Sequence, residues 1–144
     1  MLVQAIFLCL GLLFFTPAAN AADSGLQPGP DLSSVRAKIK AKDFQAALVE
    51  LKPLAAKYDD ADTFNLYAYS LRKTGNRDQA FVYYQKALQL NPNHKGALEY
   101  QGELFVETKQ MANARQNLAR LKALCPAGCE ELSDLQEAID AGPK

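Results

Sequence analysis

Residues 61–94 read ADTFNLYAYSLRKTGNRDQAFVYYQKALQLNPNH, and residues 95–128 read KGALEYQGELFVETKQMANARQNLARLKALCPAG. Laid over each other, these two 34-residue segments match in small residues, in large apolar residues and in a proline: Ala68 with Gly102, Ala80 with Ala114, Phe64 with Leu98, Leu71 with Phe105, Tyr84 with Leu118, and Pro92 with Pro126. Small residues let two helices of a hairpin approach, and large ones fill the space to the next hairpin. The two segments are therefore predicted to be neighbouring copies of one helical hairpin.

The aligned residues resemble the tetratricopeptide repeat (TPR), a helix–turn–helix unit of about 34 residues with an aromatic-to-proline signature. The signature positions are Phe64, Tyr67, Ala68, Leu71, Ala80, Tyr84, Ala87 and Pro92 in the first unit, and Gly102, Phe105, Ala114, Leu118 and Pro126 in the second. Phe64 stands where the family usually has tryptophan, and Leu121 where it usually has a small residue. The resemblance implies hairpins that stack into a curved solenoid.

Outside the two repeats, the chain continues in the same helical texture. Lys42 to Leu48 resembles the turn and second-helix start of the family, so residues 31–60 are predicted to form a degenerate TPR-like hairpin. After residue 128, Leu132, Leu135 and Ile139 share one helix face, which predicts a capping helix within residues 129–144. The predicted fold class is all-α: a short α-solenoid of stacked helix–turn–helix repeats with a C-terminal capping helix.

Apolar periodicity and turn residues place seven helices. They are expected at about residues 32–41, 44–58, 63–73, 78–90, 95–108, 112–124 and 130–142. Gly75 is expected to end the third helix in a left-handed conformation. Pro53 is expected inside the second helix, where it removes one backbone hydrogen bond and bends the helix.

The N-terminal segment is predicted to be an export signal. Residues 2–15 are almost wholly apolar, and Ala19-Asn20-Ala21 supplies small residues at the positions that a signal peptidase reads. Residues 1–21 are therefore predicted to be a cleaved signal peptide, and residues 22–30 a flexible leader. The alternative is an uncleaved anchor, although the apolar run is shorter than the ~20 residues that a membrane-spanning helix needs. The predicted location is the periplasm or the outside of the cell.

Charge balance narrows the class of partner. The chain has 16 basic and 16 acidic residues, so its formal net charge is zero. A nucleic-acid binder usually has a basic excess, and docking on anionic lipid by charge alone needs one too. The expected partner is another protein or peptide, with self-association through the open solenoid ends as a further possibility.

The TPR resemblance implies a concave groove lined by the first helix of each hairpin. In this sequence the groove residues are expected to be Asn65, Tyr69, Arg72 and Lys73 from one helix and Glu99, Glu103, Val106 and Glu107 from the next, with Asp62, Arg36 and Lys40 nearby. A basic and aromatic half thus lies beside an acidic half. The functional interpretation is a groove that orients a polar peptide, with Tyr69 as its exposed aromatic residue. The alternative is a solvated helix face whose acids pair weakly with Arg72 and Lys73.

Catalytic motifs are scarce. The chain has one histidine, His94, expected at the surface where a helix starts. No glycine-rich phosphate loop or serine nucleophile elbow occurs in the sequence. The prediction is a non-enzymatic protein without a cofactor.

Cys125 and Cys129 form the one pair of residues with chemical potential. A structural disulfide that staples the cap to the last repeat is the first interpretation, because export exposes the pair to an oxidising compartment. A redox-active dithiol and a metal site are the alternatives, and they define the second functional hypothesis, a redox or metal-handling accessory protein. The Cys-Pro-x-Gly-Cys-Glu-Glu ending is similar to that of small exported repeat proteins of bacteria.

Overall fold

The computed structural model describes residues 29–143. The predicted signal peptide and nearly all of the predicted leader lie outside these residues. Within them the chain forms seven helices and no strand: α1 (Ser33–Lys40), α2 (Phe44–Lys57), α3 (Ala61–Lys73), α4 (Arg77–Leu90), α5 (Lys95–Glu107), α6 (Met111–Leu124) and α7 (Glu130–Ala141). The predicted all-α class is confirmed, and Pro53 lies inside α2 as expected.

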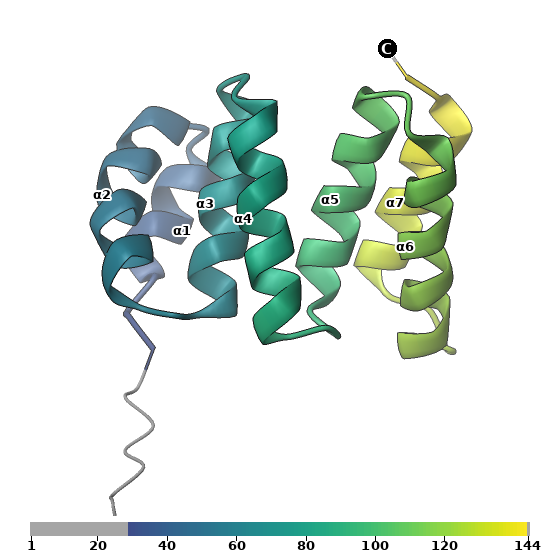
Figure 1. Ribbon diagram of the computed structural model, residues 1–144, viewed down its shortest axis with the longest axis horizontal. Coiled ribbons are helices and arrows are strands. Elements are labelled where there is room, and N and C mark those ends of the chain that lie inside the picture. Colours follow the sequence, from purple (N-terminus) through teal and green to yellow (C-terminus); the bar gives the residue numbers. More distant parts are fainter. Residues whose placement is uncertain (1–28, 144) are drawn as a thin grey trace, which may run out of the picture.

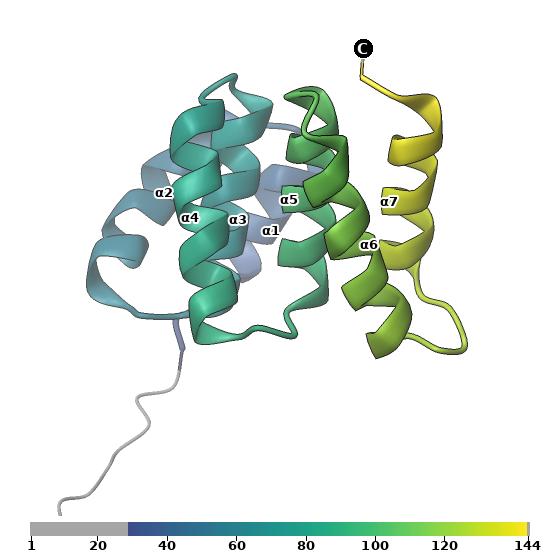
Figure 2. The same cartoon turned by 45° about the vertical axis from the view of Figure 1, so that its right-hand side comes forward.

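The helices pack as neighbouring antiparallel pairs, in the manner of a short solenoid (Figure 1). Hairpins α1–α2, α3–α4 and α5–α6 follow one another, and α7 packs against both α5 and α6. The turned view separates two rows, with α2, α4 and α6 in front of α1, α3 and α5 (Figure 2). We call α1, α3, α5 and α7 the first-helix row, because each of the first three begins a hairpin and α7 packs beside α5.

The same backbone turn joins the two helices of all three hairpins. Lys42, Gly75 and Lys109 have left-handed φ angles of 60°, 91° and 62°, and each donates its N–H to the carbonyl three residues earlier. The next residue in each turn donates to the carbonyl five residues earlier. The predicted left-handed Gly75 is confirmed. Lysine adopts this strained region at the other two turns, so the turn is imposed by the hairpin packing rather than by glycine alone.

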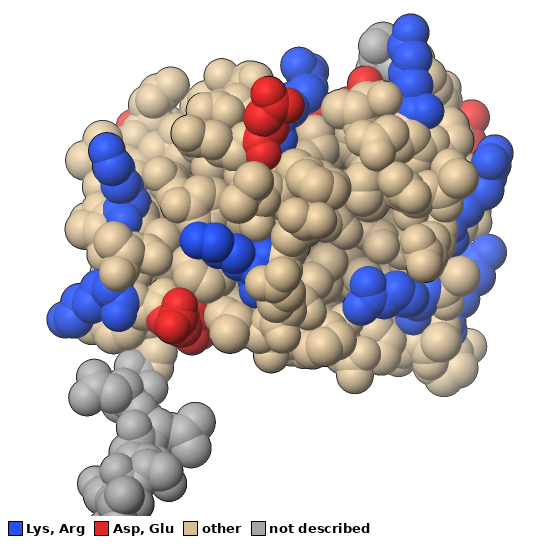
Figure 3. Space-filling model, in the orientation of Figure 1, with Lys and Arg blue, Asp and Glu red and all other residues tan. Residues whose placement is uncertain are grey.

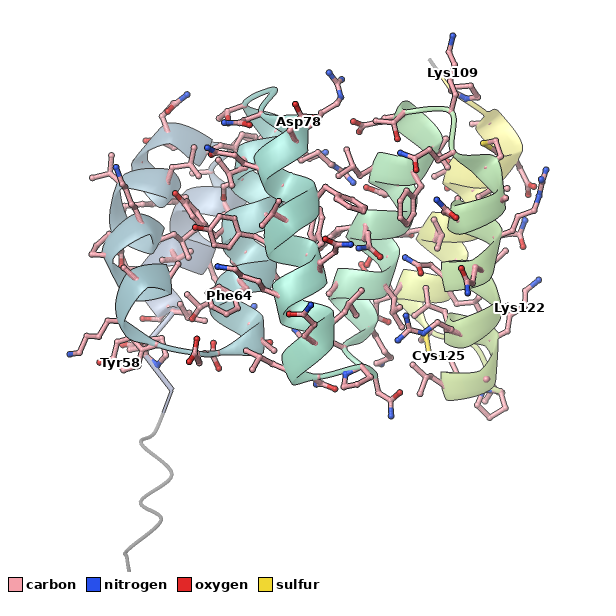
Figure 4. All side chains as sticks on the ribbon, viewed as in Figure 1. Tyr58, Phe64, Asp78, Lys109, Lys122 and Cys125 are labelled. Carbon is pink, nitrogen blue, oxygen red and sulfur yellow. A yellow bond between two sulfur atoms is a disulfide. The ribbon has the colours of Figure 1, made fainter. Side chains whose placement is uncertain are left out.

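Side-chain caps fix where four of the helices begin. Asp43, Asp60, Asn76 and His94 accept the N–H of Ala46, Thr63, Gln79 and Ala97, respectively. An N-cap acceptor satisfies one of the free N–H groups in the first turn of a helix. Figure 4 shows the hairpin turns at one end of the helices, near Asp78 and Lys109. The links that follow α2 and α6 lie at the other end, near Tyr58 and Cys125.

Helix α7 closes the core at the C-terminal end. Leu135 and Ile139 of α7 pack in one buried cluster with Leu98, Leu118 and Leu121 of α5 and α6. Leu121 is fully buried, so the bulky residue at a position that is usually small fills space against this cluster. The expected role of the aligned small residues needs one correction. Gly102 makes its closest approach to Leu135 of α7 rather than to the second helix of its own hairpin.

No helix in the described part of the chain is long and apolar enough to cross a membrane. On the face where α2, α4 and α6 stand in front, basic side chains are scattered and acidic ones are few (Figure 3).

Candidate binding face of the first-helix row

The structure separates the eight predicted groove residues by burial. Asn65, Arg72, Glu99 and Val106 are buried, Tyr69 and Glu103 are half-buried, and Lys73 and Glu107 are exposed. Half of the predicted set therefore lies in the packing between helices. Polar side chains on a first helix are covered there by the neighbouring first helix, which the helical periodicity of a single segment does not reveal.

Arg72 forms a buried ion pair across α3 and α5. Its side chain is only 3% exposed, and its guanidinium donates a hydrogen bond to a carboxylate oxygen of Glu103. The guanidinium also donates to the backbone carbonyl of Tyr100 at a distance of 2.8 Å. Its Nε lies 3.6 Å from a carboxylate oxygen of Glu107. The interpretation of Arg72 as part of a solvated face with weak pairing is wrong, because both helices shield this charge from water and shielding strengthens its electrostatic interactions.

An aromatic cluster lies beside this pair. The ring of Tyr69 lies 4.6 Å from that of Tyr100 and 5.9 Å from that of Phe44, measured between centroids. The ammonium of Lys73 lies 5.2 Å from the Tyr69 ring, within cation–π range. Tyr69 was expected to be exposed and is instead half-buried by these contacts, and this burial raises the pKa of its phenol. The basic and aromatic half predicted from the sequence is thus a packed cluster with Lys73 at its surface.

A second polar link joins three neighbouring hairpins. Asp62 at the start of α3 pairs with Arg36 of α1 at 2.6 Å and with Nε2 of His94 at 2.8 Å. The Nδ1 of His94 accepts the Ala97 N–H at 3.1 Å, so the proton of the neutral ring lies on Nε2 and is donated to Asp62. The lone histidine starts α5 as predicted, and both of its ring nitrogens serve the fold.

A cleft of about 530 Å³ lies between α5 and α7 on the first-helix row. Its lining residues are Arg77, Glu103, Val106, Glu107, Asp134, Glu137, Ala138, Ala141 and Gly142. The predicted groove included Glu103, Val106 and Glu107 but no residue of α7. The missed signal is the composition of α7, which carries five acidic residues and no basic one between Glu130 and Ala141. The cleft is therefore acidic, with Arg77 at its edge.

Glu99 is the most perturbed acid of this face. It is 5% exposed, and burial together with the charges of Glu103 and Asp134 raises the pKa of its carboxyl to about 8. Glu131 of α7 adds to the rise, and the guanidinium of Arg72 opposes it. Glu99 forms no ion pair with any residue from 29 to 143. A raised pKa means that the charged form of this carboxyl is destabilised, so protonation or a nearby cation would stabilise it.

At the C-terminal end of α6, the sulfur atoms of Cys125 and Cys129 lie at disulfide distance. Their α-carbons are 5.8 Å apart, inside the range that a disulfide spans. The link between α6 and α7 is thus closed by its two cysteines (Figure 4). Among residues 29–143, no group of three or more His, Cys, Asp and Glu side chains is placed to hold a metal ion.

No protein-family model matches this chain, and no curated protein matches it. The resemblance to the TPR family therefore rests on the signature residues alone.

Proposed function

We propose that this chain is a non-catalytic TPR-type interaction module that acts in the periplasm or outside the cell. It holds an extended segment of another protein along the first-helix row. The observation that carries this proposal is the cleft between α5 and α7, which leaves the acids Glu107, Asp134 and Glu137 accessible in a wall of packed helices. Stacked helical repeats use such continuous surfaces to bind partners.

Two further observations support a binding role. Accessible groups of opposite charge lie along one row, with Lys73 over the aromatic cluster and the α7 acids in the cleft. This arrangement can orient a partner segment in one direction. The only histidine of the sequence is used as an N-cap and as a donor to Asp62, so it supports α5 rather than proton transfer.

The test is capture of a partner from the native compartment, with the chain as bait and mass spectrometry as the readout. The binding-face variant is Lys73→Glu with Glu137→Lys, two exposed residues of α3 and α7. Glu99 and Glu103 are avoided because the first is buried and the second is bound to Arg72. The matched control, Lys122→Glu with Asp78→Lys, makes the same charge reversal on exposed residues of α6 and α4.

A specific partner is expected to bind the native chain and the control variant and to be lost from the binding-face variant. Circular dichroism of both variants checks that they remain folded. Equal retention of the partner by the two variants would place the binding surface elsewhere. Turnover of a substrate by the purified chain would end the non-catalytic assignment.

A further inference from the structure

The carboxylates of the α5–α7 cleft are unequally neutralised. Glu103 is bound to Arg72, and Glu107 pairs with Arg77 at 3.1 Å. Asp134 and Glu137 are exposed and form no ion pair with any side chain of the described residues. They are three residues apart on α7, so their side chains are neighbours on one helix face. The cleft thus presents two adjacent acids that pair with no cation among residues 29–143.

The rest of the cleft suits a long side chain with a charged end. Val106, Ala138 and Ala141 give it an apolar lining. Helices α5 and α7 both end beside it, at Glu107 and Ala141. The C-terminal end of a helix carries partial negative charge and favours cations. Lysine and arginine side chains bury apolar stems in this way while their charged heads remain among polar groups.

Glu99 adds a third acid whose environment favours a cation beside the cleft. Glu99 lies one turn before Glu103 on α5, is 5% exposed as a residue, and accepts no side-chain or backbone hydrogen bond from the described residues. The two charges that act on it most strongly, Glu103 and Asp134, both line the cleft. A buried carboxyl without a donor is costly, and a cation in the cleft would reduce that cost.

We infer that the α5–α7 cleft binds an arginine side chain from an extended partner segment, with its guanidinium on Asp134 and Glu137 and its stem on Val106, Ala138 and Ala141. This inference rests on the proposed function and names the chemistry of the partner. Arginine fits better than lysine because its planar guanidinium donates to two carboxylates at once. Residues 1–28 contain no lysine or arginine, so the N-terminal segment of the chain itself does not supply this cation.

The test is a titration of the ¹⁵N-labelled chain with two capped pentapeptides, Ala-Ala-Arg-Ala-Ala and the same peptide with citrulline in place of arginine. Citrulline has the shape of arginine without its charge, so the pair isolates the guanidinium. The expected result is at least tenfold tighter binding of the arginine peptide, with amide shifts in the C-terminal halves of α5 and α7. Asp134→Asn with Glu137→Gln is expected to weaken binding at least tenfold. Glu130→Gln with Asp140→Asn removes the same charge from exposed sites of α7 outside the cleft and is expected to change affinity less than twofold.

Equal binding of the two peptides, or equal binding by the two double variants, overturns the inference. A dimer in sedimentation velocity that the Asp134→Asn/Glu137→Gln variant abolishes, with no peptide binding, also overturns it and makes a second copy the occupant. The proposed function is judged separately. A captured partner that depends on the first-helix row but does not compete with the arginine peptide leaves the proposed function intact and removes this inference alone.

Discussion

Gly102 of α5 lies against Leu135 of α7 so closely that a β-carbon on the glycine would stand 2.6 Å from both methyl carbons of the leucine. The contact lies in the middle of the interface that attaches the last helix to the repeats. Since real β-carbons essentially never approach so closely, any side chain at residue 102 must displace α7 or its leucine. The glycine therefore allows α5 and α7 to pack closely at this point, beside the acidic cleft.

Gly102→Ala is therefore expected to destabilise the chain by about 1–2 kcal/mol. Overpacking costs about 1–3 kcal/mol, and the better helix propensity of alanine returns up to about 1 kcal/mol. In a Leu135→Ala background the same change is expected to be neutral or stabilising, because the opposing methyl groups are gone. Urea denaturation of the four chains of this cycle measures the coupling. A Gly102→Ala chain as stable as the native one would contradict the contact.

Removal of Arg72 is expected to cost about 3–5 kcal/mol, because Arg72→Leu leaves the Glu103 carboxylate partly buried without its cation. The adjacent Lys73→Leu is the matched control. Lys73 is exposed and forms no ion pair with the described residues, so this change is expected to stay within about 0.5 kcal/mol. Denaturant midpoints of the two variants provide the comparison. Similar losses of stability for the two variants would mean that the Arg72 guanidinium is solvated and not part of a buried ion pair.

The sequence predicted helix positions well because the ends of the helices are set locally. Asp43, Asp60, Asn76 and His94 precede helices that they cap, and Gly75 ends one in a left-handed turn. Such signals act over a few residues and need no knowledge of the fold. Apolar periodicity and turn residues alone already place each expected helix within two residues of the observed one at both ends, and these caps are the physical reason for four of the starts.

Burial on the first-helix row could not be predicted in the same way. Arg72 and Glu99 occupy polar positions on α3 and α5 and become buried only because the next first helix covers them. Gly102 likewise packs against α7, outside its own hairpin, which the alignment of small residues within a hairpin does not predict. The cleft acids Asp134 and Glu137 were missed because α7 was treated only as a cap, although its acidic composition distinguishes it from an inert covering helix.

His94→Ala is expected to destabilise the chain by about 1 kcal/mol, because α5 loses the Nδ1 acceptor that caps Ala97. His94→Asn is the informative partner variant. Asparagine is a good N-cap but is too short to reproduce the contact of Nε2 with Asp62, so it is expected to recover most of the loss. Thermal denaturation of the two variants at pH 8 measures the difference. An asparagine variant as unstable as the alanine one would assign the effect to the Asp62 contact.

Opening the bond between Cys125 and Cys129 is expected to cost about 2 kcal/mol, because a closed ring of five residues restricts the unfolded chain only moderately. Cys125→Ser with Cys129→Ser is compared with the native chain in urea, with and without reductant. Reductant is expected to lower the stability of the native chain to that of the variant. Thiol titration of the folded native chain tests the competing redox hypothesis. A pair that mild reductant opens easily, with no loss of stability, would favour the accessory function.

The stability of the chain is expected to fall as the pH rises from about 4.5 to 8, because of Glu99. In the folded chain its pKa is about 8, above the ordinary glutamate value of 4.5, so the folded state holds a proton that the unfolded state has already released. The free energy of unfolding therefore decreases steadily as the pH rises through this window, and the loss is constant above it. Glu99→Gln cannot ionise, so it is expected to match the native chain near pH 5 and to exceed its stability by roughly 3–5 kcal/mol at pH 9.

Urea denaturation at pH 5, 7 and 9 measures this divergence. Glu130→Gln is the control, because Glu130 is exposed on α7 and its loss is expected to leave the pH dependence of the native chain unchanged. The groups that face Glu99 are Glu103, Asp134, Glu131 and Arg72, and all of them remain in both variants. The divergence therefore reports on the buried carboxyl itself. Parallel pH profiles for the native chain and Glu99→Gln would mean that the Glu99 carboxyl is hydrated, and Glu99 would then give no support to cation binding in the α5–α7 cleft.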